Sequence, residues 1–120
     1  MDRDQVKYVP VEAGEFDTEA WVGGERVGYV WCERDGDALL LADITVCQGC
    51  RGRGIGTTLL RRVLRAADSA GVRRTWGSVT ADDLRRWPGL LDWYGCHGFA
   101  VEEPDAECVP EAVKKVIRRG

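Results

Sequence analysis

Length, composition and charge exclude several classes of protein. The chain has 120 residues, of which 44% are hydrophobic and 31% charged, and its net charge is −3 at pH 7. These values are typical of one globular domain with a single core, so we expect one domain over residues 1–120. Broad nucleic-acid binding needs a basic face, so we expect no nucleic-acid partner. A mildly negative chain suits a cationic amine substrate.

The sequence shows no membrane or secretion signal. Residues 1–4 (Met-Asp-Arg-Asp) are charged and lack the apolar run of a signal peptide, and no stretch approaches the length of a membrane-spanning helix. The five cysteines are odd in number and irregularly spaced, which does not suit a disulfide framework. We therefore expect a cytoplasmic protein with no membrane partner.

The first third of the chain has the pattern of antiparallel strands. Apolar alternation and turn signals predict four strands, over residues 6–11, 18–22, 26–33 and 39–46. The first has Pro10 near its end, as an edge strand permits. Gly23-Gly24 and Asp35-Gly36 are typical of the tight turns that join the others. Residues 12–17 leave room only for a turn.

A helix and a parallel strand are predicted next. After the strand at 39–46, the segment that ends at Ala70-Gly71 carries one apolar stripe, made by Leu59, Leu60, Val63, Leu64 and Ala67. Its arginines Arg61, Arg62 and Arg65 are expected to face water. Gly71 is a natural helix stop. Residues 75–80 then form a strand parallel to 39–46, because a strand–helix–strand unit makes a right-handed crossover.

The last third is predicted to hold short helices and one strand. Residues 82–87 form a short helix that Pro88 interrupts, and Pro88 opens a second helix over 89–97. Residues 99–102 return as a strand. Pro110 begins a final amphipathic segment in which Val113, Val116 and Ile117 stand at helical spacing, so the pattern indicates a helix, and a strand is the alternative left open.

The most informative segment is a glycine loop between the strand at 39–46 and the following helix. Residues 47–58 read CQGCRGRGIGTT. Glycines let the backbone turn sharply, and the first turn of a helix offers unpaired N–H groups and a positive dipole to phosphate oxygens. Thr57 and Thr58 are expected to cap the helix or to add hydroxyl donors. A phosphate-binding Walker loop needs a lysine, and a dinucleotide fingerprint needs a third glycine, so neither fits.

The spacing Arg51-x-x-Gly54-x-Gly56 resembles the acyl-CoA pyrophosphate signature Arg/Gln-x-x-Gly-x-Gly/Ala of the GNAT superfamily of N-acyltransferases. The wider stretch 46–56 is similar to the family's V-x-P-x-x-R-G-x-G-I-G, with Gln48 where proline is usual. Residues 93–99, WYGCHGF, are similar to its aromatic-Tyr-x-x-x-Gly-Phe motif. The resemblance implies an α/β (α+β) fold, with a mixed, mostly antiparallel central sheet and helices on both faces. The short N-terminal region lacks the family's usual lid helices.

The resemblance also implies acetyl-CoA as cofactor and a set of residues that bind it. Backbone N–H groups of the loop would hold the pyrophosphate, and main-chain groups at the end of the central strand would bind pantetheine and polarise the thioester carbonyl. The cofactor-binding residues expected on this basis are Ile44, Thr45, Val46, Cys47, Arg51, Gly52, Arg53, Gly54, Ile55, Gly56 and Thr57.

Two residues are expected to move protons. Tyr94 takes the position of the family's general acid, and a phenol has an ordinary pKa of about 10, near that of a thiol. The alternative interpretation of Tyr94 is an aromatic side chain that packs under the next strand. Asp43 stands where some members carry a glutamate on the central strand, and a carboxylate in apolar surroundings could accept a proton through water. The alternative is an outward-facing, solvated aspartate. Glu33 and Glu102 are the further candidates for the base.

Other chemistry-bearing residues have two interpretations each. Cys47 and Cys50, with Cys96 and His97, could form a zinc set, but the first pair occupies the cofactor-binding edge, so no metal is expected. His97 is either a base or a residue at a helix end. Trp87 and Trp93 line an acceptor pocket or belong to the core. Trp87 stands where the family often has an asparagine.

We therefore predict an N-acetyltransferase that moves an acetyl group from acetyl-CoA to a primary amine by direct transfer in a ternary complex. The acceptor is a peptide or protein amine, or a small cationic amine. A homodimer or a partner protein could complete the acceptor site. The alternative is a catalytically inactive acyl-CoA-binding module with a regulatory or assembly role.

Overall fold

The computed structural model describes residues 5–12 and 14–120. The charged start at residues 1–4, and position 13 within the predicted turn, lie outside the described residues. The chain divides into two compact units. The first comprises Met1–Glu33 and Leu41–Gly71, and the second comprises Arg34–Leu40 and Val72–Gly120. Each unit is described by itself below.

The elements follow one another as strands, helix, strand, helices and strands. The strands are β1 (Lys7–Pro10), β2 (Thr18–Val22), β3 (Glu25–Asp35), β4 (Ala38–Val46), β5 (Arg74–Thr80), β6 (Ala100–Glu102) and β7 (Ala112–Arg119). The helices are the 3-10 turn η1 (Gln48–Cys50), α1 (Ile55–Ser69), α2 (Ala81–Arg86) and α3 (Leu90–Cys96). The strand order is β1-β2-β3-β4-β5-β7-β6. The pair β4–β5 is parallel, and β1–β2, β2–β3, β5–β7 and β6–β7 are antiparallel. The predicted mixed, mostly antiparallel sheet is confirmed.

In the first unit, tight turns and one irregular pair shape the strands. Gly23 and Gly24 have φ of 56° and 85°, which only glycine adopts readily, so they form the predicted hairpin between β2 and β3. The register moves from Ala20 opposite Gly28 to Trp21 opposite Arg26, so β3 contains one extra residue. This bulge changes which side chains of β3 share a face. The residues described between β1 and β2 form a turn, closed by the Val11 N–H that donates to the Asp17 carbonyl at 3.0 Å.

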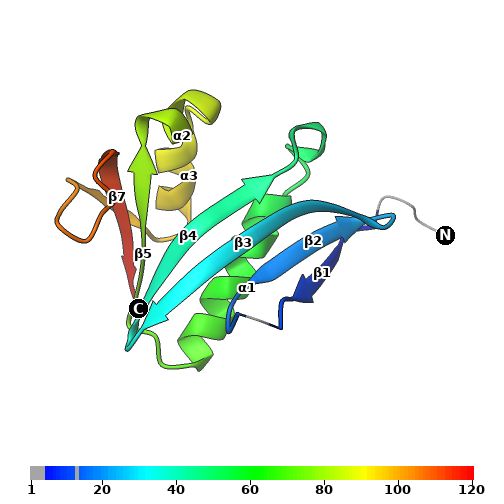
Figure 1. Ribbon diagram of the computed structural model, residues 1–120, viewed down its shortest axis with the longest axis horizontal. Coiled ribbons are helices and arrows are strands. Elements are labelled where there is room, and N and C mark those ends of the chain that lie inside the picture. The colour runs from blue at the N-terminus through cyan, green and yellow to red at the C-terminus, as the bar shows by residue number, and fades with distance from the viewer. Residues whose placement is uncertain (1–4, 13) are drawn as a thin grey trace. The chain divides into compact units, whose positions relative to one another are not determined.

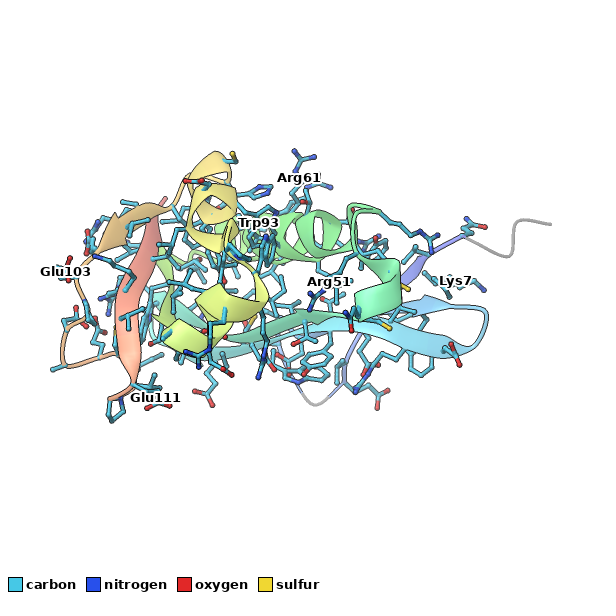
Figure 2. The ribbon with its side chains drawn as sticks, turned by 90° about the horizontal axis from the view of Figure 1, so that it is seen from above. Lys7, Arg51, Arg61, Trp93, Glu103 and Glu111 are labelled. Atoms are coloured by element: carbon cyan, nitrogen blue, oxygen red, sulfur yellow. The ribbon has the colours of Figure 1, made fainter. Side chains whose placement is uncertain are left out.

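Helix α1 packs on the strands of the same unit, as Figure 1 shows for its neighbours β2 and β3. Its buried side chains are Ile55, Leu59, Leu60, Val63, Leu64 and Ala67, which include the whole predicted stripe. Gly28 of β3 faces this helix: a Cβ there would lie 3.4 Å from side-chain carbons of both Ile55 and Leu59. Arg61 points away from the strands (Figure 2). Gly71, with φ of 78°, ends the helix as predicted.

The second unit contains the parallel strand pair and the short helices. Ala38, at the start of β4, lies opposite Arg74 of β5. Thr80 caps α2: its hydroxyl accepts from the Asp83 N–H, and the Asp83 carboxylate accepts from the Thr80 N–H. Helix α3 follows Pro88 and carries Tyr94. These elements match the predicted ones within one or two residues.

The final segment is a strand, so the helix predicted after Pro110 is wrong. Strand β7 pairs with β5 on one side and with β6 on the other. Lys115, Val116 and Ile117 are buried in succession, which shows that both faces of β7 are covered. A strand covered on both faces loses the alternation of apolar and polar residues. Adjacent buried residues such as these then imitate the spacing of apolar residues in a helix.

Candidate functional site

The glycine loop of the first unit is anchored at its start. The Cys47 N–H, just past β4, donates to the Val27 carbonyl of β3 at 2.7 Å. The turn η1 follows and is closed by the Cys50 N–H, which donates to the Cys47 carbonyl at 2.9 Å. Arg51 comes directly after this turn and is exposed beside it (Figure 2). These bonds attach the loop to the sheet and leave the next residues at the surface.

Two glycines then direct the chain into helix α1. Gly52 and Gly54 have φ of 84° and 76°, and a Cβ at either would meet no atom within 4 Å. The backbone conformation therefore requires glycine there, and the space beside each is open. Gly54 is the N-cap of α1, and the Thr58 N–H makes a helical bond to its carbonyl at 3.0 Å. Thr57 and Thr58 lie inside the first turn, so the predicted threonine cap is wrong.

The start of α1 suits an anion. Ile55 is buried in the core and fixes the position of the first turn. That turn contains no acidic residue, and Arg51 and Arg53 precede it. The N–H groups of a first helical turn have no acceptor within their own helix, and the helix dipole is positive at this end. Amides, two arginines and an open, Cβ-free surface are a donor set that fits a pyrophosphate.

Asp43 lies just before the strand segment predicted to contact the cofactor. Its carboxylate is exposed, and both its oxygens accept hydrogen bonds: Oδ2 from the Tyr29 hydroxyl at 2.9 Å, and Oδ1 from the Thr45 hydroxyl at 3.1 Å. The apolar surroundings expected for this carboxylate are therefore wrong, and the outward-facing alternative describes its position. Along the predicted strand segment, Ile44 and Val46 are half-buried, whereas Thr45 and Cys47 are exposed.

Tyr29 belongs to an aromatic and charged cluster that the sequence reasoning missed. Its ring stacks on Trp31, with centroids 4.5 Å apart and planes 22° from parallel. The Arg26 guanidinium lies over both rings, 4.9 Å from the Tyr29 centroid and 5.8 Å from that of Trp31. Glu19 pairs with Arg26 at 3.0 Å and accepts from the Trp21 indole at 3.2 Å. No motif marks these residues, because strand register and the bulge in β3 bring them together.

The second unit holds the other predicted catalytic residue, Tyr94. It is 5% exposed, and its ring lies 5.1 Å from those of both Trp93 and Phe99. These contacts agree with the packing interpretation and leave the acid role a prediction. Trp87, 39% exposed, has its ring 4.8 Å from that of Trp93, so it does not belong to the core. His97 ends α3 as the helix-end interpretation expects, with its ring 5.1 Å from that of Trp93.

The remaining candidates have ordinary surroundings. Glu33 is exposed, and Glu102 pairs with Arg119 at 3.3 Å. All five cysteines are free. Over residues 5–12 and 14–120, no group of three or more histidine, cysteine, aspartate or glutamate side chains could hold a metal ion. Within the same ranges, no helix has the length and apolarity needed to cross a membrane.

Comparison with known proteins identifies the family. The chain matches the family model described as the Acetyltransferase (GNAT) family over residues 3–88, which is more than half its length. The chain belongs to this family. The mixed α/β fold with its mostly antiparallel sheet matches GNAT acetyltransferase folds. No curated protein matches the sequence.

Solved structures share the fold at low sequence identity. The PaiA N-acetyltransferase from Thermoplasma acidophilum, in complex with coenzyme A, is 15% identical, with a TM-score of 0.71 over 87% of this chain and 60% of that one. Naa50 from Arabidopsis thaliana, in complex with the bisubstrate analogue CoA-Ac-MVNAL, is 21% identical, with a TM-score of 0.70 over 90% and 75%. The IAA acetyltransferase from Bacillus cereus is 15% identical, with a TM-score of 0.68 over 97% and 99%.

The chain is shorter than several of these relatives. It spans 60% of the Thermoplasma protein and 66% of a GNAT-family acetyltransferase from Staphylococcus aureus. It spans almost all of the Bacillus cereus protein. At identities below 25%, these likenesses show the fold alone.

Proposed function

We propose that this chain is an N-acetyltransferase that moves the acetyl group of acetyl-CoA to a primary amine by direct transfer in a ternary complex. The observation that supports this most is the loop at residues 51–57, where glycines at positive φ lead into the open start of α1, which has no side-chain cap. The family to which the chain belongs is one of acetyltransferases. Coenzyme A, named with the Thermoplasma structure, is the ligand that we assign to the loop.

The loop residues would hold the diphosphate of the cofactor by charge and by backbone donors. The N–H groups of the first turn of α1 are directed out of the N-terminal end of the helix, where anions are stabilised. Arg51 and Arg53 add positive charge beside them. Residues 44–47 precede the loop and would bind pantetheine through the main chain. When bound, acetyl-CoA supplies the thioester whose acyl carbon the amine attacks.

Two side chains are assigned to proton transfer. Asp43 takes a proton from the acceptor ammonium, directly or through water, so that the amine becomes a nucleophile. Its two hydroxyl partners, Tyr29 and Thr45, are neutral, so its charge is available to a cation. Tyr94 gives a proton to the sulfur as the carbon–sulfur bond breaks.

The proposed acceptor is a peptide or protein amine, or a small cationic amine. The turn between β1 and β2, where lid helices are usual in the family, supports an open acceptor side. A second copy or a partner protein would complete that side. The proposed location is the cytoplasm, where the five free cysteines would stay reduced.

The test combines acetyl-CoA binding with turnover. Isothermal titration with acetyl-CoA measures the affinity that we assign to the loop. CoA release across a panel of amines measures acetyl transfer. We expect Gly54→Ala to weaken acetyl-CoA binding by about tenfold, since a Cβ would stand at the surface that the diphosphate approaches. Unchanged affinity would contradict the loop assignment. Tight binding without acceptor-dependent CoA release would favour the acyl-CoA-binding module.

A matched control separates ligand contact from backbone strain. Gly36, in the turn between β3 and β4, has φ of 62°, and a Cβ added there would likewise meet no atom within 4 Å. Gly36→Ala therefore imposes the same left-handed strain on an alanine, about 1 kcal/mol, in a turn that contains none of the loop residues. We expect it to lower stability as Gly54→Ala does and to leave the affinity for acetyl-CoA at the wild-type value.

A further inference from the structure

The Asp43 carboxylate is held in one orientation by hydroxyls from two strands. Tyr29 reaches it from β3 with an O–H···O distance of 2.9 Å, and Thr45 reaches it from β4 itself at 3.1 Å. Each hydroxyl bonds to a different carboxylate oxygen, so rotation of the carboxylate would break at least one bond. The remaining lone pairs of both oxygens stay available at an exposed position.

The Tyr29 ring is itself fixed. It stacks on Trp31 at 4.5 Å, and the Arg26 guanidinium covers it at 4.9 Å. Arg26 is in turn held by Glu19 at 3.0 Å. A tyrosine held by a stacked ring and an adjacent cation loses little freedom when its hydroxyl bonds to Asp43, so the bond is preorganised.

The geometry points to Tyr29 as a positioning residue: its hydroxyl orients the Asp43 carboxylate for proton abstraction from the acceptor amine. This inference rests on the proposed function, because it gives Tyr29 a part in the same site. Tyr29 acts through Asp43 and touches neither substrate nor cofactor in this role. Its removal should lower kcat, with binding of acetyl-CoA unaffected.

The first test is kinetic. Tyr29→Phe keeps the ring in its stack and removes the hydroxyl. We expect kcat to fall about tenfold, with KM and the affinity for acetyl-CoA little changed, as loss of a hydrogen bond to a charged group in the transition state predicts. Tyr8→Phe is the matched control: Tyr8 lies on β1 under Arg62 in the same unit and should keep the wild-type kcat.

A double-mutant cycle distinguishes positioning from general packing. If Tyr29 acts through Asp43, Tyr29→Phe should have almost no further effect on kcat in an Asp43→Asn background. Additive losses in the cycle would overturn the inference and leave the proposed function standing.

A second measurement does not depend on turnover. Crystal structures of the two variants show the orientation of the Asp43 carboxylate directly. Tyr29→Phe should release the carboxylate from its single orientation, whereas Tyr8→Phe should not. An unchanged orientation in Tyr29→Phe would refute the inference. A changed orientation in a protein that transfers no acetyl group to any amine would support the Tyr29–Asp43 contact while refuting the proposed function.

Discussion

Replacing Lys115 by methionine tests what holds the loop between β6 and β7. Lys115 is 3% exposed, yet it carries an ammonium group. Its Nζ lies 2.8 Å from Asp105 Oδ2 and 2.9 Å from Glu107 Oε1, and 5.1 Å from the centre of the Trp76 ring. Glu107 also accepts two bonds from Arg74, at 3.0 Å and 2.8 Å. One buried cation thus attaches two residues of the loop to β7.

The cost of losing this cation follows from its surroundings. Methionine keeps the unbranched stem, so little packing is lost. Breaking a buried ion pair costs about 3–5 kcal/mol when the remaining charge stays buried. Here the carboxylates of Asp105 and Glu107 are 48% and 41% exposed and can be rehydrated. We therefore expect Lys115→Met to lower the free energy of unfolding by about 2 kcal/mol, and the Tm by roughly 6–10 °C.

The effect should depend on pH. Hydrogen bonds from Arg74 and from Lys115 lower the pKa of Glu107 from 4.5 to about 2. A carboxyl whose pKa is depressed in the folded state contributes its stability fully above its unfolded value, and loses it as pH falls through the folded value. The stability difference between wild type and Lys115→Met should thus be constant above about pH 5 and shrink from about pH 4.5 towards pH 2.

Urea denaturation at about pH 7 and about pH 3 measures both quantities, since the first value lies above that transition and the second lies within it. Lys114→Met is the control, because the neighbouring Lys114 pairs at 2.7 Å with Glu103, which is largely exposed. An exposed pair is worth less than about 1 kcal/mol, so this variant should be close to wild type. Equal small losses from both lysines, or a Lys115→Met loss that is the same at both pH values, would refute the reasoning.

Three further outcomes are expected. Gly28→Ala should destabilise the first unit by about 1–3 kcal/mol in urea denaturation, because its Cβ would lie 3.0 Å from the Thr45 carbonyl oxygen; wild-type stability would show that the strands can move apart. Tyr94→Phe should lower kcat more than it raises KM in steady-state assays, and an equal change in both would indicate packing instead of proton transfer. Thr80→Ala should cost about 1 kcal/mol by removing the cap of α2, and Thr80→Ser should restore the wild-type Tm.

Much of the fold could be predicted because its signals are local. The hairpin at Gly23-Gly24 and the helix stop at Gly71 follow from backbone conformations that only glycine adopts readily. The apolar stripe of α1 follows from helical periodicity. The loop at residues 51–56 could be predicted in the same way, since the chemistry of a helix start depends on residues next to one another in the chain.

One error arose where neighbours distant in sequence decide, and the other arose within the glycine loop itself. At β7, which has a strand on either side, Val116 and Ile117 are buried on opposite faces, and the resulting spacing imitates a helix. At α1, Gly54 takes the cap position that was expected of the threonines, because the loop before it turns in a left-handed conformation.

The sequence by itself determined the order of most elements and the glycine loop, because each depends on a local pattern. It also determined the candidates Asp43 and Tyr94, because each stands at a motif position. Only the tertiary structure decided that Tyr29 bonds to Asp43 and that Lys115 holds Asp105 and Glu107. The first pair joins two different strands, β3 and β4, and the second forms around Lys115, which is buried in β7. Such contacts join residues 8 to 14 positions apart, and no local pattern encodes them.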